Sequence, residues 1–121
     1  MNEVLDMAVV DELLALSDDG DPELLLDLIR LFLDDGPSKL ATLSEGLRAR
    51  DCDKIERAAH SLKGSSGNLG ARRMQHTCEQ LQLAMRSKDL ATAERLAPEL
   101  SAQFDDVRAA LTRLQQRYAV N

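Results

Sequence analysis

A histidine, a lysine and two glycines stand close together in the stretch AAHSLKGSSGNLG, residues 58–70. His60 and Lys63 are three residues apart, so on a helix both side chains project from the same side. A neutral imidazole is a competent nucleophile, and a neighbouring ammonium can neutralise an anionic group that the ring attacks. Gly64 and Gly67 follow, although a glycine inside a helix costs about 0.5–1 kcal/mol relative to alanine. The stretch therefore predicts a nucleophilic histidine beside a gap that admits another protein's surface.

The apolar periodicity around His60 predicts that the imidazole faces water. A helix is expected over about 53–66, because Asp53 and Glu56 have the spacing of a capping box. The positions that repeat every three to four residues form its buried stripe: Ile55, Ala58, Ala59, Leu62 and Ser66. His60 and Lys63 fall outside this stripe, so we expect both in solvent.

The rest of the chain also has helical periodicity. N-terminal helices are expected over about 6–50, the first from Asp6 to about Leu16 and the next after Asp21. Gly36-Pro37 either breaks or kinks this second helix, and a further segment runs from 38 to about 50. Another helix is expected over about 72–87, and a long last helix over about 90–118, in which Pro98 is expected to cause a bend but not an end.

Composition and connection lengths predict the fold class. The chain has 22 leucines and 15 alanines against only 7 valines and isoleucines together, which favours helices over strands. The expected helices are joined by short connections, which place consecutive helices antiparallel. We therefore predict one all-α domain over residues 1–121, an up-and-down antiparallel four-helix bundle with additional N-terminal helices.

Several functional classes are disfavoured by the same composition. No run approaches the roughly 18 apolar residues of a membrane span, and no signal-peptide pattern is present, so no membrane is expected. A net charge of −6 and 2% aromatic residues argue against nucleic acid. Cys52 and Cys78 are too few for a disulfide framework or a zinc site, which predicts a cytoplasmic protein without a metal of its own.

Charge is divided unevenly along the chain. Residues 1–56 have a net charge of −10 and residues 57–121 a net charge of +4, and no acidic residue lies between Arg57 and Cys78. This stretch also contains Lys63, Arg72 and Arg73. Two interpretations remain open: ordinary solvated charges on a helix face, or a positive field around His60 that attracts an anionic partner.

The motif AAHSLKGSSGNLGA resembles the H-x-L-K-G-[SA]-[SA]-x-x-L-G pattern of histidine-containing phosphotransfer (HPt) domains. The resemblance extends to the lead-in helices and to CEQLQ, residues 78–82. It implies a helical bundle that carries a phosphoryl group between the aspartates of receiver domains. It also implies receiver domains, and possibly a hybrid sensor kinase, as partners of a monomeric protein. The magnesium ion would belong to the receiver, so no cofactor is expected in this chain.

The resemblance also implies a role for individual residues. His60 would be phosphorylated, on Nε2, and Lys63 would stabilise the phosphoryl oxygens. The small residues of the motif would leave clearance at the docking surface: Gly64, Ser65 and Gly67. Gln82 matches a glutamine that hydrogen-bonds near the active histidine in some relatives, and Arg86 matches a supporting base, although for both a merely structural role is an equal alternative.

Two other functional classes remain as alternatives. The first is the dimerisation and phosphoacceptor element of a histidine kinase, although Ser61 follows His60 where such kinases usually have an acid, and no nucleotide-binding segment is evident. The second is a purely structural helical adaptor in which His60 is incidental. The HPt interpretation predicts a phosphocarrier that is not itself an enzyme.

Overall fold

The protein is a bundle of α-helices in the computed structural model, which describes residues 4–17 and 20–118. Five helices follow one another in these residues, and no strand occurs among them: α1 (Met7–Ala15), α2 (Glu23–Ala49), α3 (Cys52–Asn68), α4 (Arg72–Arg86) and α5 (Leu90–Tyr118). The predicted all-α class is therefore confirmed. No helix in the described part of the chain is both long enough and apolar enough to cross a lipid bilayer.

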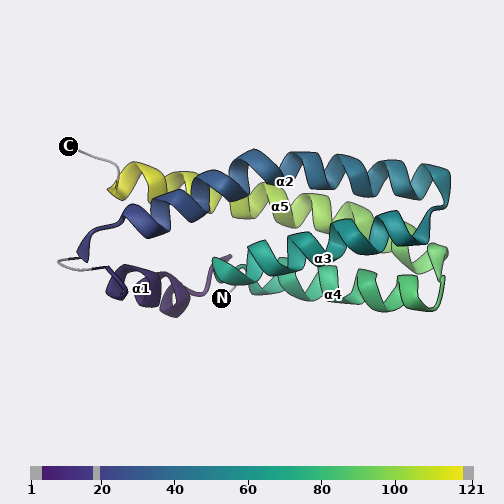
Figure 1. Ribbon diagram of the computed structural model, residues 1–121, viewed down its shortest axis with the longest axis horizontal. Coiled ribbons are helices and arrows are strands. Elements are labelled where there is room, and N and C mark those ends of the chain that lie inside the picture. The colour runs from purple at the N-terminus through teal and green to yellow at the C-terminus, as the bar shows by residue number, and fades with distance from the viewer. Residues whose placement is uncertain (1–3, 18–19, 119–121) are drawn as a thin grey trace.

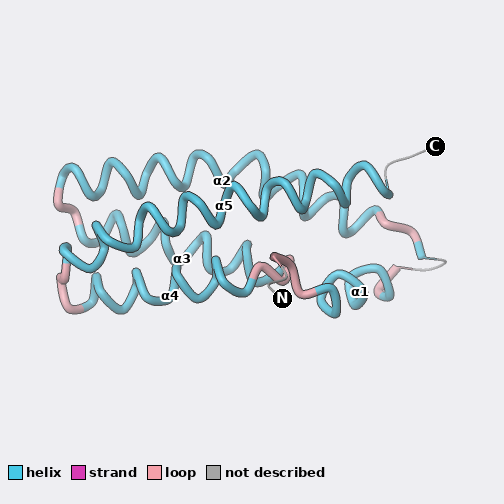
Figure 2. Tube along the Cα trace, turned by 180° about the vertical axis from the view of Figure 1, so that it is seen from behind, coloured by secondary structure: helices cyan, strands magenta, loops and turns pink. Residues whose placement is uncertain are grey.

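Helices α2 to α5 form a four-helix bundle in which consecutive helices run in opposite directions (Figure 1). Each of the four packs against its neighbour in sequence, and α5 also contacts α2, which closes the bundle. The α2–α3 and α4–α5 turns lie at one end of the bundle, and the α3–α4 turn lies toward α1 (Figure 2). A single apolar core joins all four helices. The predicted up-and-down bundle is thus confirmed, with α1 as an additional N-terminal helix that contacts α2.

Helix α2 is one continuous element of 27 residues that passes through Pro37. The predicted alternative of a break at Gly36-Pro37 is therefore wrong. Gly36 is buried, and a Cβ atom built on it would overlap the ring of Phe104 on α5. Phe32 stacks on the same ring, with 5.4 Å between the ring centroids. Gly36 is thus required by packing, and burial of two aromatic rings outweighs the backbone hydrogen bond that Pro37 removes.

The N-cap of α3 lies two residues before the one that the capping-box pattern predicts. Its N-cap is Asp51, whose side chain accepts a hydrogen bond from the backbone N–H of Lys54 at 3.1 Å. Asp53 lies in the first turn instead, so the predicted cap at Asp53 is wrong. Asp51 stands two residues before Asp53 and forms the same kind of cap, which local spacing alone does not distinguish.

The N-terminal segment is anchored to the α3–α4 turn. Asp6 is the N-cap of α1, as predicted, and its side chain accepts a hydrogen bond from the N–H of Ala8. The backbone N–H of Asp6 donates to the carbonyl of Gly70 at 2.8 Å, and Arg72 Nε donates to Asp6 Oδ2 at 2.6 Å. Gly70 has a φ of +78°, and a Cβ there would lie 2.8 Å from the carbonyl oxygen of Asp6. The turn between α3 and α4 is therefore fixed by both its conformation and its contacts.

Candidate functional site

Helix α3 turns His60 away from the core, as its periodicity predicts. The predicted buried stripe of this helix is the observed one: Ile55, Ala58, Ala59, Leu62 and Ser66. His60 is exposed. The buried Ser66 is satisfied within its own helix, because its hydroxyl donates to the carbonyl of Leu62 at 2.6 Å. The core-facing half of α3 therefore holds the imidazole at the surface on a rigid element.

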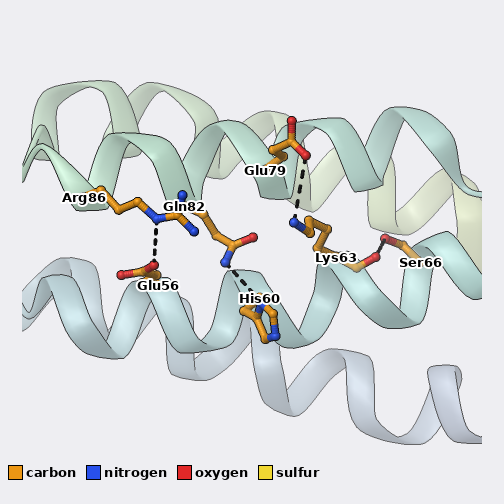
Figure 3. Close-up of polar contacts among 7 residues, drawn as sticks. All are labelled: Glu56, His60, Lys63, Ser66, Glu79, Gln82 and Arg86. Carbon is orange, nitrogen blue, oxygen red and sulfur yellow. Dashed lines mark hydrogen bonds and ion pairs between the residues drawn. The ribbon is translucent and has the colours of Figure 1, made fainter.

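Three contacts between α3 and α4 form a ladder centred on His60 (Figure 3). From one end to the other they join Lys63 with Glu79, His60 with Gln82, and Glu56 with Arg86. The partners are spaced three to four residues apart on both helices, which places them on the facing sides of α3 and α4. We call these six residues the α3–α4 face.

The central contact is the most buried one. The side chain of Gln82 is only 4% exposed, and its Nε2 lies 3.2 Å from His60 Nδ1. The other amide atom of Gln82, Oε1, is buried without a hydrogen-bond partner in the described part of the structure. Because the Gln82 amide is buried in a packed helix, it restrains His60 Nδ1, the ring nitrogen that it contacts. The imidazole therefore has Nδ1 directed toward the protein.

The two outer contacts are weaker ion pairs. Lys63 Nζ lies 3.9 Å from Glu79 Oε1, and the two side chains are 33% and 55% exposed. Arg86 Nε lies 3.3 Å from Glu56 Oε2. Exposed pairs of this kind contribute on the order of 0–1 kcal/mol, so both cations can exchange partners readily. Lys63 is thus held beside His60 without being committed to Glu79.

The α3–α4 face is close to electrically balanced. Lys63 and Arg86 are each matched by an acid, so the unpaired positive charge next to His60 is that of Arg57, which is exposed three residues earlier on α3 and forms no ion pair in the described residues. Arg72 and Arg73 instead line a groove between α4 and α5. The acid-free stretch is contiguous in sequence, but the fold divides its charges between two places.

Glutamates 56 and 79 belong to the site but were not among the predicted residues. Their signal in the sequence is spacing: Glu56 is four residues before His60, and Glu79 is three residues before Gln82. Both positions share a helix face with a candidate site residue. The two helix faces meet because α3 packs against α4. Spacing along one helix does not specify which helix it packs against.

The two glycines of the motif have different surroundings. A Cβ atom added at Gly64 would meet no other atom within 4 Å, so the space beside this residue is open. At Gly67 it would overlap the amide of Gln75 on α4, so Gly67 makes room for a side chain of its own chain. Ser65 is half-buried, and its hydroxyl donates to the carbonyl of Leu62 at 3.3 Å. The gap next to His60 thus comes from Gly64, and clearance for a partner does not follow for Gly67.

A buried thiol lies under this part of the bundle. Cys78 on α4 is fully buried, and desolvation raises its pKa to about 12, although the nearby charge of Lys63 acts in the opposite direction. The thiol is therefore protonated at neutral pH and packs as an apolar group. Within residues 4–17 and 20–118, no three histidine, cysteine or acidic side chains come together in a way that could hold a metal ion.

The structure is thus a four-helix bundle that presents His60 outward, beside Lys63 and the open space at Gly64. The family model described as Hpt domain matches residues 27–116, which span most of α2 and the whole of α3 and α4 and nearly all of α5. The chain belongs to the Hpt domain family. Helix α1 lies outside the matched residues.

Solved structures and curated proteins show the same likeness. Histidine-containing phosphotransfer protein B from Pseudomonas aeruginosa superposes with a TM-score of 0.88 at 30% identity, over 98% of this chain and 99% of that one. Multistep phosphorelay regulator 1 of Schizosaccharomyces pombe is 33% identical over 89 residues, which are 72% of this chain and 30% of that protein. Histidine-containing phosphotransfer protein 1 of rice is 32% identical, over 74% of this chain and 66% of that protein. The chain thus spans less than two thirds of the length of both curated relatives.

Proposed function

We propose that this protein is a phosphorelay intermediate whose phosphoryl group is carried on His60. The observation that carries the proposal is the surrounding of the ring: His60 is exposed, Nδ1 contacts the buried Gln82, and the space at Gly64 is open. The names of the relatives, which include a phosphorelay regulator and phosphotransfer proteins, support the same role.

The proposed transfer begins with a receiver domain that carries a phosphoaspartate. The lone pair of His60 Nε2 attacks the phosphorus in line, the bond between phosphorus and the aspartyl oxygen breaks, and the receiver's carboxylate leaves with the electron pair. The product is a phosphoramidate on His60. A second receiver's aspartate then attacks the phosphorus, and His60 Nε2 is the leaving group.

This attack requires one particular tautomer of His60. The donor and acceptor roles in the Gln82 contact depend on which ring nitrogen carries the proton. A half-turn of the Gln82 amide brings its Oε1 to His60 Nδ1–H. In that arrangement His60 Nε2 keeps its lone pair and points to the partner. The carbonyl oxygen then also stabilises the positive charge that the ring gains on attack. Nitrogen-15 NMR of the imidazole is expected to show mostly Nδ1–H in the wild type and less of it in Gln82→Leu.

Lys63 supplies the positive charge on this side of the reaction. Its ammonium is proposed to leave the long contact with Glu79 and bind the phosphoryl oxygens, because a phosphoryl group has a higher charge than one carboxylate. The remaining requirements, an aspartate and the magnesium ion, are assigned to the receiver. In this proposal the protein carries the group and has no kinase activity of its own.

The structure supports a monomeric carrier over the kinase alternative. A kinase dimerisation element completes its four-helix bundle with helices from a second copy, whereas here α2 to α5 of one chain close the bundle. We accordingly propose a monomer that acts in the cytoplasm, with receiver domains and a hybrid sensor kinase as partners. Gly64, and with it the exposed rim of the α3–α4 face, is the proposed contact point for the receiver.

The test is transfer from a phosphorylated receiver to the purified protein. Label that is acid-labile and alkali-stable is expected on the wild type and absent from His60→Gln. His76→Gln is the matched control, since His76 is the other histidine of the chain and is exposed on α4. Label that persists in His60→Gln, or that disappears in His76→Gln alone, would refute the assignment to His60. An adaptor would retain its partner's function in His60→Gln, whereas a carrier would lose it.

A further inference from the structure

A polar groove lies between α4 and α5, on the side of α4 away from His60. It has a volume of about 600 Å³. The α4 residues that line it include Arg73, His76 and Gln80, whereas Gln82 and Arg86 of the same helix contact α3. The two sets occupy different faces of the helix, so a ligand in this groove would leave His60 accessible.

Positive charge predominates in the groove. Arg72, Arg73 and Arg95 line it with His76, and Glu99 is the one acid among the lining residues. Arg72 is bound to Asp6, but Arg73 and Arg95 form no ion pair in the described part of the chain. In a protein of net charge −6, two such arginines in one hollow form a local site for anions.

The groove extends along the helices, with a cation toward each end. Arg73 and Gln80 are seven residues apart on α4, a distance of about 10 Å along the helix axis. Because α5 runs antiparallel to α4, Gln103 lies beside the start of α4 and Arg95 lies toward Gln80. About three residues of an extended peptide span the same 10 Å. The spacing fits several carboxylates along one extended segment better than it fits a single small anion.

One buried acceptor in the groove lacks a donor. Gln103 lines the groove, and its Oε1 is buried without a hydrogen-bond partner in the described residues. A buried oxygen in this state destabilises the fold until the amide turns toward the groove and a donor reaches it. The main-chain N–H groups of a peptide are donors of this kind, whereas a fully deprotonated inorganic anion such as sulfate has none. No phenylalanine, tyrosine or tryptophan lines the groove, so it offers no platform for stacking bases.

We propose that this α4–α5 groove is a second protein-binding site, which takes an extended acidic segment of a partner through Arg73 and Arg95 and satisfies Gln103 with a main-chain N–H. A partner seated there can remain bound while a receiver occupies His60. The proposal is independent of the role assigned to His60, because the two sites share no residue.

A labelled peptide tests the site directly. The probe is a fluorescein-labelled dodecapeptide of alternating glutamate and serine, and the control peptide has glutamine in place of glutamate. Fluorescence polarisation is expected to show saturable binding of the acidic peptide only. Arg73→Glu/Arg95→Glu is expected to weaken binding at least tenfold, and Gln103→Leu about threefold.

Matched variants distinguish the groove from general electrostatics. Arg48→Glu/Arg113→Glu makes the same change in net charge at exposed arginines outside the groove, and it is expected to bind like the wild type. His60→Gln is also expected to bind like the wild type. Equal losses in the two double variants, or loss in His60→Gln, would overturn the proposal. So would displacement of the peptide by an equimolar amount of inorganic triphosphate, because a small anion would then be the better ligand.

Discussion

Two glycines of this bundle, Gly36 on α2 and Gly64 on α3, have opposite surroundings. Between α2 and α5, Gly36 is buried against the ring of Phe104, so the missing side chain is replaced by aromatic packing within the molecule. On α3, Gly64 is exposed and has open space where a side chain would be. The first glycine is explained by stability. The second weakens its helix and gains no contact inside the chain, which is why its explanation lies in a partner.

The same contrast holds for polar groups. The α2–α5 interface contains a buried, stacked ring pair, Phe32 and Phe104. The α3–α4 face is joined by one buried amide, Gln82, which restrains His60, and by two exposed ion pairs. The ion pairs are weak and exchange easily. The core sides of α3 and α4 are packed as well, so only the surface contacts of the α3–α4 face can exchange.

The largest effect is expected on the packed side. Phe104→Ala removes a ring that contacts Phe32 and Gly36, and it should lower the free energy of unfolding by about 3–5 kcal/mol, because the cavity cannot fully collapse. Urea titration followed by circular dichroism measures this loss. Leu83→Ala, at a residue that is 46% exposed, is the control and should change stability by less than about 1 kcal/mol. Similar losses in both variants would show that the α2–α5 contact is not special.

The next effect is expected on transfer rather than on stability. Gly64→Gln places a side chain in the open space beside His60, where it should obstruct the receiver and slow phosphotransfer by about tenfold to a hundredfold. The urea midpoint should stay at or above that of the wild type. Stopped-flow or gel-based transfer from a phosphorylated receiver provides the rate. An unchanged rate would remove the reason we give for this glycine.

Features that depend on residues within one helix are predictable from the sequence, whereas features that depend on contacts between helices are not. The bounds of α5 and the outward phase of His60 follow from apolar spacing along one helix, and both are observed. The roles of Gly36, Gly64 and Gly67 do not follow from spacing, because each depends on what lies opposite: Phe104, open space or Gln75.

The same limit applies to the site and to the caps. His60 and Lys63 are recognisable from a local motif, but the ion pairs of Glu79 and Glu56 need the register of α4 against α3. The cap of α3 is a local feature that was still missed, since Asp51 and Asp53 both suit the position and only the turn after α2 selects Asp51.

A pair of alanine substitutions compares the two glycines directly. Gly64→Ala should raise the free energy of unfolding by about 0.5–1 kcal/mol, because alanine is the better helix residue and meets no atom there. Gly36→Ala should lower it by about 1–3 kcal/mol, because the new methyl group overlaps the Phe104 ring. Thermal and urea unfolding of both variants provide the signs. Equal signs would mean that the two environments do not differ as described.

The smallest effect is expected at the N-terminal anchor, which belongs to neither interface. The hydrogen bond from Arg72 lowers the pKa of Asp6, with a further contribution from the N–H of Ala8. A pKa that is lower in the folded state means that the ionised carboxylate stabilises the fold above its unfolded pKa, and that this stabilisation disappears as the pH falls through the folded value.

Asp6→Asn keeps a capping side chain and removes the charge. The variant should therefore be slightly less stable than the wild type at pH 7, and the difference should shrink as the pH falls below about 4 and vanish below the folded pKa of Asp6. Transfer to His60 should be unaffected at pH 7, since the anchor lies at the α3–α4 turn; a slower transfer would show that this turn also positions the α3–α4 face.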